Sequence, residues 1–143
     1  MSHKTISIII PCLNAEKTIQ RAFDSLKNQT CNDFECIVMD GMSSDKTLEI
    51  IEKNSNIVDT LVSEKDDSGA DAVNKAIKLC QGNMICFLYA DDFLSADAVD
   101  SIIKANEMQN VTVAIEAGMQ IPPSGLLGSE DSNFIGIEAQ EGI

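Results

Sequence analysis

The chain has 143 residues, of which 44% are hydrophobic and 23% are charged, and it carries a formal net charge of −13. This composition is typical of a soluble globular protein and excludes an intrinsically disordered chain. The acidic surplus argues against nucleic acid as a partner, because phosphate backbones bind surfaces rich in Lys and Arg.

The apolar run nearest the N-terminus, Ile8 to Ile10, is far too short for a signal peptide or a membrane span. We therefore expect a cytoplasmic protein without a transmembrane segment, and we leave peripheral membrane association and homo-oligomer formation open. The five cysteines show no Cys-x-x-Cys spacing, so we expect free thiols rather than disulfides or a zinc site. The single histidine, His3, precedes the first predicted strand, which leaves Ser-His-Asp or Cys-His catalysis without a candidate base.

The first predicted unit consists of a short apolar strand, a turn and an amphipathic helix. Residues 5–11 form a continuous β-branched run, as expected for a strand that is covered on both faces. Asn14 is predicted to cap the helix that follows, whose apolar positions begin at Ile19. A second strand over 35–40 precedes a helix for which Ser43 and Ser44 are the candidate caps.

Two further units repeat this order. A short strand over 60–62 leads to a helix from about Gly69, and a strand over 84–89 leads to a helix capped by Ser95. Strands that alternate with helices predict an α/β fold with a mostly parallel sheet and helices on both faces. Beyond residue 106 the pattern loosens into an acidic tail, in which 111–115 and 134–138 are candidates for one or two further strands.

Polar side chains follow three of the predicted strands. They are Asn14 and Glu16 after the first strand, Asp40 and Ser43 after the second, and Asp91 and Asp92 after the fourth. In a doubly wound sheet, ligands bind outside the carboxyl ends of the strands, at the point where the strand order reverses. The sequence therefore predicts a ligand site along this edge.

The adjacent carboxylates Asp91 and Asp92 repel each other unless a cation lies nearby. The sequence has no G-x-x-x-x-G-K-[ST] loop, and no G-x-G-x-x-G follows the first strand. A phosphorylated ligand at this edge therefore needs a divalent cation to offset its charge. Because Mn²⁺ and Mg²⁺ prefer one or two carboxylates plus substrate phosphates, we expect either ion at Asp92 and Asp91.

Two long segments carry a resemblance to a known family. The stretch SIIIPCLNAEKTIQRAFDSLKNQTCNDFECIVMDGMSSDKTLEII resembles the opening of the family 2 glycosyltransferases, and SEKDDSGADAVNKAIKLCQGNMICFLYADDF resembles their continuation through the metal-binding acidic motif. The resemblance covers about Thr5 to Ile103. It implies a Rossmann-like GT-A fold and inverting, metal-dependent transfer of a sugar from a UDP-type nucleotide-sugar donor to a saccharide or lipid-linked acceptor.

The resemblance also implies roles for single residues. Pro11, Asn14 and Glu16 match the loop that cradles the nucleotide, Asp40 matches the acid that hydrogen-bonds the uracil with Ser43 nearby, Asp71 matches an acid that lines the donor pocket, Asp91 matches a ribose or metal contact, and Asp92 matches the metal ligand. As a uracil contact, Asp40 is expected to matter for UDP binding and to contribute little to thermal stability.

Each of these positions has a structural alternative that the residues alone leave open. Asn14 and Ser43 can be only helix caps, and Glu16 can complement a helix N-terminus. Asp40, which precedes Gly41, can be a turn residue, and Asp71 can be an ordinary helix residue.

The general base is unassigned. Family members run well past the acidic motif into an acceptor-binding half that supplies this base, and the candidates here, Glu116, Glu130 and Asp131, lie in no supporting pattern. We therefore interpret the chain as a truncated GT-A fold, with a donor-binding domain over 1–106 and the acidic tail over 107–143. A non-catalytic module that binds nucleotide sugars or assists assembly is the alternative function.

Overall fold

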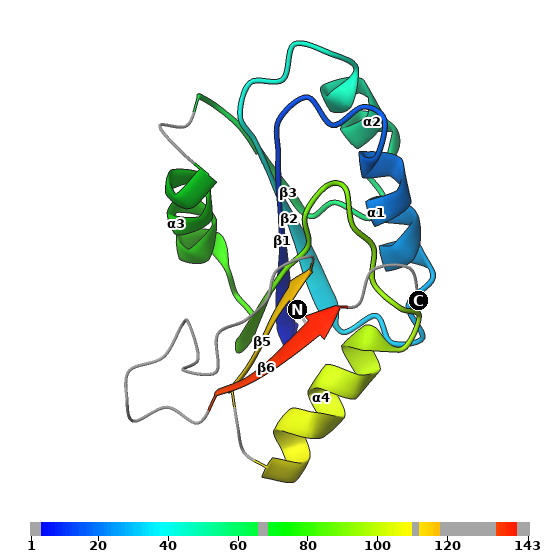
Figure 1. The fold of residues 1–143 in the computed structure, drawn as a ribbon, viewed down its shortest axis with the longest axis vertical. Coiled ribbons are helices and arrows are strands. Elements are labelled where there is room, and N and C mark those ends of the chain that lie inside the picture. Colours follow the sequence, from blue (N-terminus) through cyan, green and yellow to red (C-terminus); the bar gives the residue numbers. More distant parts are fainter. Residues whose placement is uncertain (1–3, 66–68, 110–111, 118–133, 140–143) are drawn as a thin grey trace.

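Strands and helices alternate along the chain in the computed structural model, which describes residues 4–65, 69–109, 112–117 and 134–139. The elements are β1 Ile6–Cys12, α1 Ile19–Lys27, β2 Phe34–Asp40, α2 Thr47–Lys53, β3 Thr60–Ser63, α3 Gly69–Leu79, β4 Met84–Phe87, α4 Ala98–Gln109, β5 Thr112–Ala117 and β6 Phe134–Ala139 (Figure 1). The described strands form one six-stranded sheet in the order β3-β2-β1-β4-β5-β6. All neighbouring pairs are parallel, which confirms the predicted α/β fold class.

Helices cover both faces of this sheet. On one face, α1, α2 and α4 pack against a core that includes Ile8 and Ile10 of β1. On the other face, α3 packs against a smaller core that includes Ile9 (Figure 1). Successive side chains of a strand point to opposite faces, so the unbroken Ile run of β1 supplies both cores at once. The β-branched run was therefore a correct sign of a strand buried on both sides.

The strand order reverses at β1. The chain runs outward from β1 through β2 to β3 and then returns to place β4 on the other side of β1. In the ladders, Cys12 is level with Asp40, and Ile9 is level with Phe87. The carboxyl ends of β1, β2 and β4 therefore meet at one edge, which is where doubly wound sheets bind ligands.

The C-terminal part of the described chain continues the sheet. β5 pairs with β4 and β6 pairs with β5, and α4 runs to Gln109, past the predicted domain boundary at 106. Glu130 and Asp131 lie outside the described residues. The division into 1–106 and 107–143 stays a prediction.

The cysteines and the helices bear on two further expectations from the sequence. All five cysteines are free thiols, and Cys36 and Cys86 are buried in the core, as predicted. No helix within the described ranges has both the length and the apolar composition to cross a membrane.

We predict that Gly82→Ala destabilises the fold, because Gly82 lies against the backbone of β1. A Cβ at this position would lie 2.7 Å from the amide nitrogen of Ser7 and 2.8 Å from the carbonyl carbon of Ile6. Relieving such an overlap requires backbone shifts that cost about 1–3 kcal/mol. Urea unfolding should show this loss, whereas Gln81→Ala, which truncates an exposed side chain next to it, should unfold like the wild type. Equal stability of Gly82→Ala and wild type would contradict the close approach.

Candidate functional site

The structure brings most of the predicted site residues to the edge where β1, β2 and β4 end. Pro11 lies in β1 and is level with Met39 of β2. Asn14 and Glu16 follow β1, Asp40 ends β2 with Ser43 just after it, and Asp91 and Asp92 follow β4. The site is therefore built from three loops that the strand order holds side by side.

Asp40 is the most deeply buried of these residues, with 1% of its surface exposed. Its Oδ2 atom accepts hydrogen bonds from the backbone N–H groups of Met42 and Ser43, both at 3.1 Å, and from the Ser63 hydroxyl at 2.7 Å. Its Oδ1 atom accepts one from the Ser43 hydroxyl at 2.5 Å. The structure thus shows Asp40 as the anchor of the turn after β2, while its contact with a uracil stays a prediction.

The Cys12 thiol adds to this cluster, since its sulfur lies 3.7 Å from Oδ1 of Asp40 and donates to it. Burial, followed by the neighbouring Asp40 charge, raises the pKa of Cys12 far above its ordinary range. The thiol therefore stays protonated and acts as a donor to the carboxylate rather than as a nucleophile.

Asn14 joins the loop after β1 to the loop after β2. Its backbone N–H donates to the Ser43 hydroxyl at 2.8 Å, and its side-chain oxygen accepts from the Ser44 N–H at 2.8 Å. The prediction that Asn14 caps the first helix was wrong, because α1 begins only at Ile19 and its N-cap position is Thr18. Asn14 instead adopts a positive φ of 51°, a conformation that Asn tolerates better than most residues.

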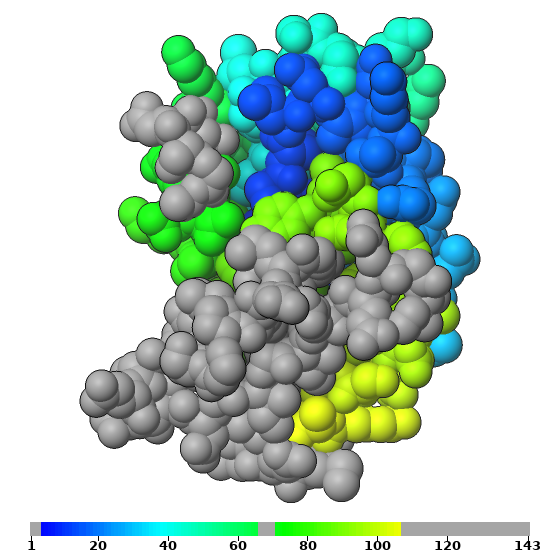
Figure 2. All heavy atoms as spheres, in the orientation of Figure 1, coloured from blue at the N-terminus to red at the C-terminus, as the bar shows by residue number. Residues whose placement is uncertain are grey.

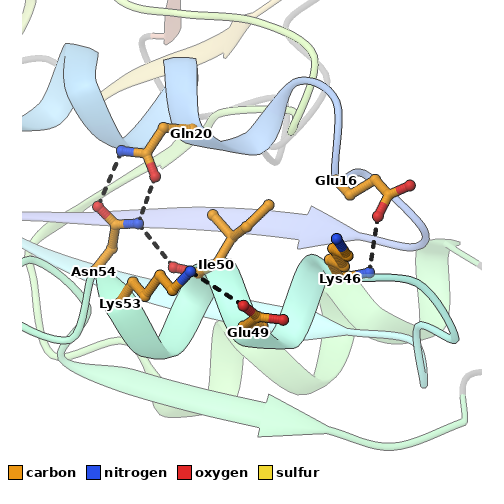
Figure 3. Close-up of polar contacts among 7 residues, drawn as sticks. All are labelled: Glu16, Gln20, Lys46, Glu49, Ile50, Lys53 and Asn54. Carbon is orange, nitrogen blue, oxygen red and sulfur yellow. Dashed lines mark hydrogen bonds and ion pairs between the residues drawn. The ribbon is translucent and has the colours of Figure 1, made fainter.

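Glu16, in the loop after β1, and Asp45, in the loop after β2, take part in hydrogen bonds that join these two loops. The Glu16 carboxylate accepts from the Lys46 N–H at 3.0 Å (Figure 3). The Glu16 N–H donates to Asp45 at 3.2 Å. Asp45 also accepts from the Thr47 N–H at 2.9 Å. Glu16 therefore complements the N-terminus of α2, the structural alternative that its position left open, and its role in cradling a nucleotide stays a prediction.

Ser43 and Ser44, the candidate caps of α2, do not occupy its N-cap position, which is Lys46. They bond instead to Asn14 in the loop after β1. Sequence reasoning missed Asp45, although an Asp two residues before a Thr at a helix start is a recognised side-chain turn. Partial burial raises the pKa of Asp45, but the hydrogen bonds from Thr47 and from the Glu16 N–H outweigh this and hold the pKa below its ordinary value.

A pair of side-chain amides fixes the two helices that carry these loops. Gln20 of α1 donates to the side-chain oxygen of Asn54, just after α2, and Asn54 donates back to Gln20 at 2.8 Å (Figure 3). Asn54 also donates to the Ile50 carbonyl at 2.8 Å. Because Asn54 is buried, this pairing gives the spacing of α1 and α2 little freedom.

The two adjacent carboxyl residues differ in environment. Asp91 is exposed, whereas Asp92 is 7% exposed and its N–H donates to the Tyr89 carbonyl at 3.0 Å. Arg21 of α1 donates to the backbone carbonyl of Asp91. Within the described chain, no group of three or more His, Cys, Asp or Glu residues could hold a metal ion.

Asp71 lies in the first turn of α3, which begins at Gly69 as predicted. Its carboxylate forms an ion pair with Lys75 at 3.1 Å, and Lys75 also pairs with Glu64 at 2.9 Å. This is the environment of a helix residue paired at i and i+4, and its place in a donor pocket stays a prediction.

Comparison with known proteins identifies the family of this chain. Residues 7–134 match glycosyl transferase family 2, so the chain belongs to that family and the expected resemblance is confirmed. It is 40% identical over 97 residues to a PGL/p-HBAD biosynthesis glycosyltransferase of Mycobacterium tuberculosis, an alignment that covers 66% of this chain and 38% of that relative. It is 41% identical over 102 residues to a chondroitin synthase of Pasteurella multocida, covering 69% of this chain and 10% of the relative.

Solved structures agree with this assignment. S. aureus TarS 1-349 in complex with UDP-GlcNAc aligns with a TM-score of 0.72 and 25% identity, covering 84% of this chain and 37% of that one. The predicted GT-A fold is confirmed by this likeness. The chain spans about two fifths of the length of the mycobacterial relative that it matches, given the 38% coverage.

We predict that Asp40→Ala lowers the free energy of unfolding by about 2–4 kcal/mol, because several buried donors lose their acceptor. The burial of Asp40 argues against the expectation from the sequence that its removal leaves stability nearly unchanged. Asp40→Asn keeps one acceptor oxygen and should lose less. Chemical unfolding of the three proteins measures the order, and a wild-type midpoint for Asp40→Ala would show that the turn does not depend on this carboxylate.

We also predict a pH effect at the crossing of the two loops. Because the pKa of Asp45 is lower in the folded state, ionised Asp45 stabilises the fold above its unfolded-state pKa of about 4, and this contribution is lost as the pH falls through the folded-state value. Asp45→Asn should therefore flatten the loss of melting temperature below about pH 4. Parallel melting curves of wild type and variant across the acid range would exclude this role of Asp45.

Proposed function

We propose that this chain binds a UDP-type nucleotide sugar, with Mn²⁺ or Mg²⁺, as the donor-binding part of an inverting glycosyltransferase that acts on a saccharide or lipid-linked acceptor. The observation that carries the proposal is the meeting of the loops after β1, β2 and β4 at the point where the strand order reverses. Membership of glycosyl transferase family 2 supports the binding of a nucleotide sugar at this edge.

The choice of donor rests on the related proteins. TarS, at 25% identity over most of this chain, was solved with UDP-GlcNAc, which supports a uridine diphosphate sugar. The relative named as a chondroitin synthase supports a saccharide acceptor.

The loop between β4 and α4, residues 88–97, carries Asp91 and Asp92 and is called the acidic loop below. Its residues fit a hard divalent cation. Asp91 is exposed and Asp92 is buried, and both offer carboxylate oxygens in the loop after β4. Mg²⁺ and Mn²⁺ bind in such places through one or two carboxylates and complete their shell with water and substrate phosphates. When bound, the ion would offset the charge of the donor's diphosphate and of the departing nucleotide.

The protein residues have separate tasks in this proposal. Asp91 and Asp92 hold the ion, and Pro11, Asn14 and Glu16, at the end of β1 and in the loop after it, lie along the nucleotide. The bonds of Asn14 and Glu16 to the turn after β2 keep that loop in one conformation before the donor arrives. Such preorganisation lowers the ordering cost of binding. We assign donor binding to the described residues and no base catalysis.

We predict that UDP binds much more tightly with Mn²⁺ than in EDTA, because two phosphates next to two carboxylates otherwise repel. Isothermal titration calorimetry measures both affinities. Asp92→Asn keeps the shape of the side chain but removes a proposed metal ligand. In the presence of Mn²⁺, its affinity for UDP should therefore be about ten-fold or more lower than that of the wild type. The matched control is Asp97→Asn, an exposed carboxylate a short way along the same segment, which should bind like the wild type. Equal UDP affinity with and without Mn²⁺ would reject the metal site.

A further inference from the structure

Helix α1 and the residues just after it contact the acidic loop at several points. The space-filling view shows the segment after β4 lying directly against the N-terminal part of the chain (Figure 2). Upstream, Arg21 donates to the Asp91 carbonyl. Downstream, the backbone N–H of Thr30 donates to the Ala96 carbonyl at 2.9 Å, and Leu94 packs into the core shared with Phe23. The position of the loop is therefore set from one side.

Arg21 contacts the residues on both sides of Asp92. Besides its bond to the Asp91 carbonyl, its guanidinium carbon lies 5.0 Å from the centroid of the Phe93 ring, in cation–π geometry. A planar guanidinium can donate in its plane and stack on a ring at the same time, which an ammonium group does not reproduce. One exposed side chain thus holds the residue before Asp92 and the residue after it.

Gln29 holds the far end of the loop in a different way. It is 7% exposed, its side-chain nitrogen donates to the Ser95 carbonyl at 2.7 Å, and its side-chain oxygen accepts from the Val99 N–H at 3.1 Å. These bonds satisfy buried backbone groups, so loss of Gln29 would disturb the fold itself. Arg21 lies at the surface, so its loss should leave the core intact.

Open space borders the part of the loop that Arg21 holds. A cavity of about 350 Å³ opens between α1 and the loop, and its lining includes Arg21, Ser25, Phe93 and Ser95. Side chains that border open space have room to change position, unlike those in a close-packed core. Beside this space, Arg21 reaches from α1 to the loop, where it donates to the Asp91 carbonyl and lies over the Phe93 ring.

We propose that Arg21 is a positioning residue that holds the acidic loop in its metal-binding conformation, an inference that rests on the proposed metal site. In this role Arg21 acts through the loop and contacts neither the metal nor the donor. The bond to the Asp91 carbonyl and the stacking on Phe93 fix the backbone on either side of Asp92, and through it the direction of both carboxylates. Outer contacts of this kind typically change metal affinity by ten-fold or more.

The sign of the effect separates this role from simple electrostatics. Arg21 carries a positive charge, and removing a positive charge near a cation site should strengthen cation binding. Loss of a positioning contact should weaken it. Arg21→Ala therefore has opposite expected outcomes under the two accounts. Lys17→Ala, which removes one positive charge from an exposed residue just before α1, is the matched control for charge alone.

The first experiment needs no metal. The chain has one tyrosine and no tryptophan, so tyrosine fluorescence reports only on Tyr89, which precedes the acidic pair. In Arg21→Ala we expect stronger acrylamide quenching of Tyr89 and faster hydrogen exchange of the Asp92 amide, at a melting temperature close to that of the wild type. Lys17→Ala should leave both signals unchanged. Unchanged Tyr89 quenching and Asp92 exchange in Arg21→Ala would overturn the proposal.

The second experiment measures Mn²⁺ binding from the EPR signal of the free ion. We expect Arg21→Ala to bind Mn²⁺ about ten-fold more weakly, Arg21→Lys to fall between it and the wild type, and Lys17→Ala to bind equally or more tightly. Equal or tighter binding by Arg21→Ala would overturn the positioning role. If the wild type itself binds no Mn²⁺, the proposed metal site fails, while the quenching and exchange data still decide whether Arg21 holds the loop.

Discussion

Strand β1 is paired with β2 along one side and with β4 along the other, and the rest of the candidate site depends on this double pairing. Its register sets Cys12 level with Asp40 and so aligns the loops that leave β1 and β2. Its other side brings the acidic loop to the same edge. Because both faces of β1 are buried, a shift of its register by one residue would exchange the side chains of the two cores. The core thereby fixes the positions of the loops at the carboxyl ends of these strands.

The candidate site is held together from within as well as from the core. Asp40 gathers donors from its own turn and from β3, while Asn14 and Glu16 exchange bonds with the turn that follows it. A buried carboxylate is costly unless it is well hydrogen-bonded, so this edge tolerates few rearrangements. On the side of β4, Arg21 of α1 and Gln29, just after this helix, bond to the acidic loop. Helix α1 therefore links both halves of the proposed donor site.

The sequence predicted the elements well because each rests on a local pattern. The Ile run of β1 and the alternation of strands with helices follow from burial on two faces and from spacing along the chain. It predicted less well which partner each loop residue takes. Asn14 has the composition of a helix cap, yet α1 begins at Ile19, and Asn14 bonds to Ser44, which is distant in sequence. No local sequence pattern predicted the contact of Arg21 with the acidic loop. A surface arginine on a helix is common, and its partner Asp91 lies far along the chain.

The central claim is that the edge formed by β1, β2 and β4 binds a metal ion, and paramagnetic broadening by Mn²⁺ tests it most directly. In ¹⁵N-labelled protein, sparing amounts of Mn²⁺ with UDP should broaden the amide signals of Asp91 and Asp92 first, followed by those of Asn14 and Ser43. Glu35, an acidic residue at the opposite end of β2, serves as an internal control and should stay sharp. Broadening that is strongest around Glu35, or that is spread evenly over the acidic surface, would contradict the account.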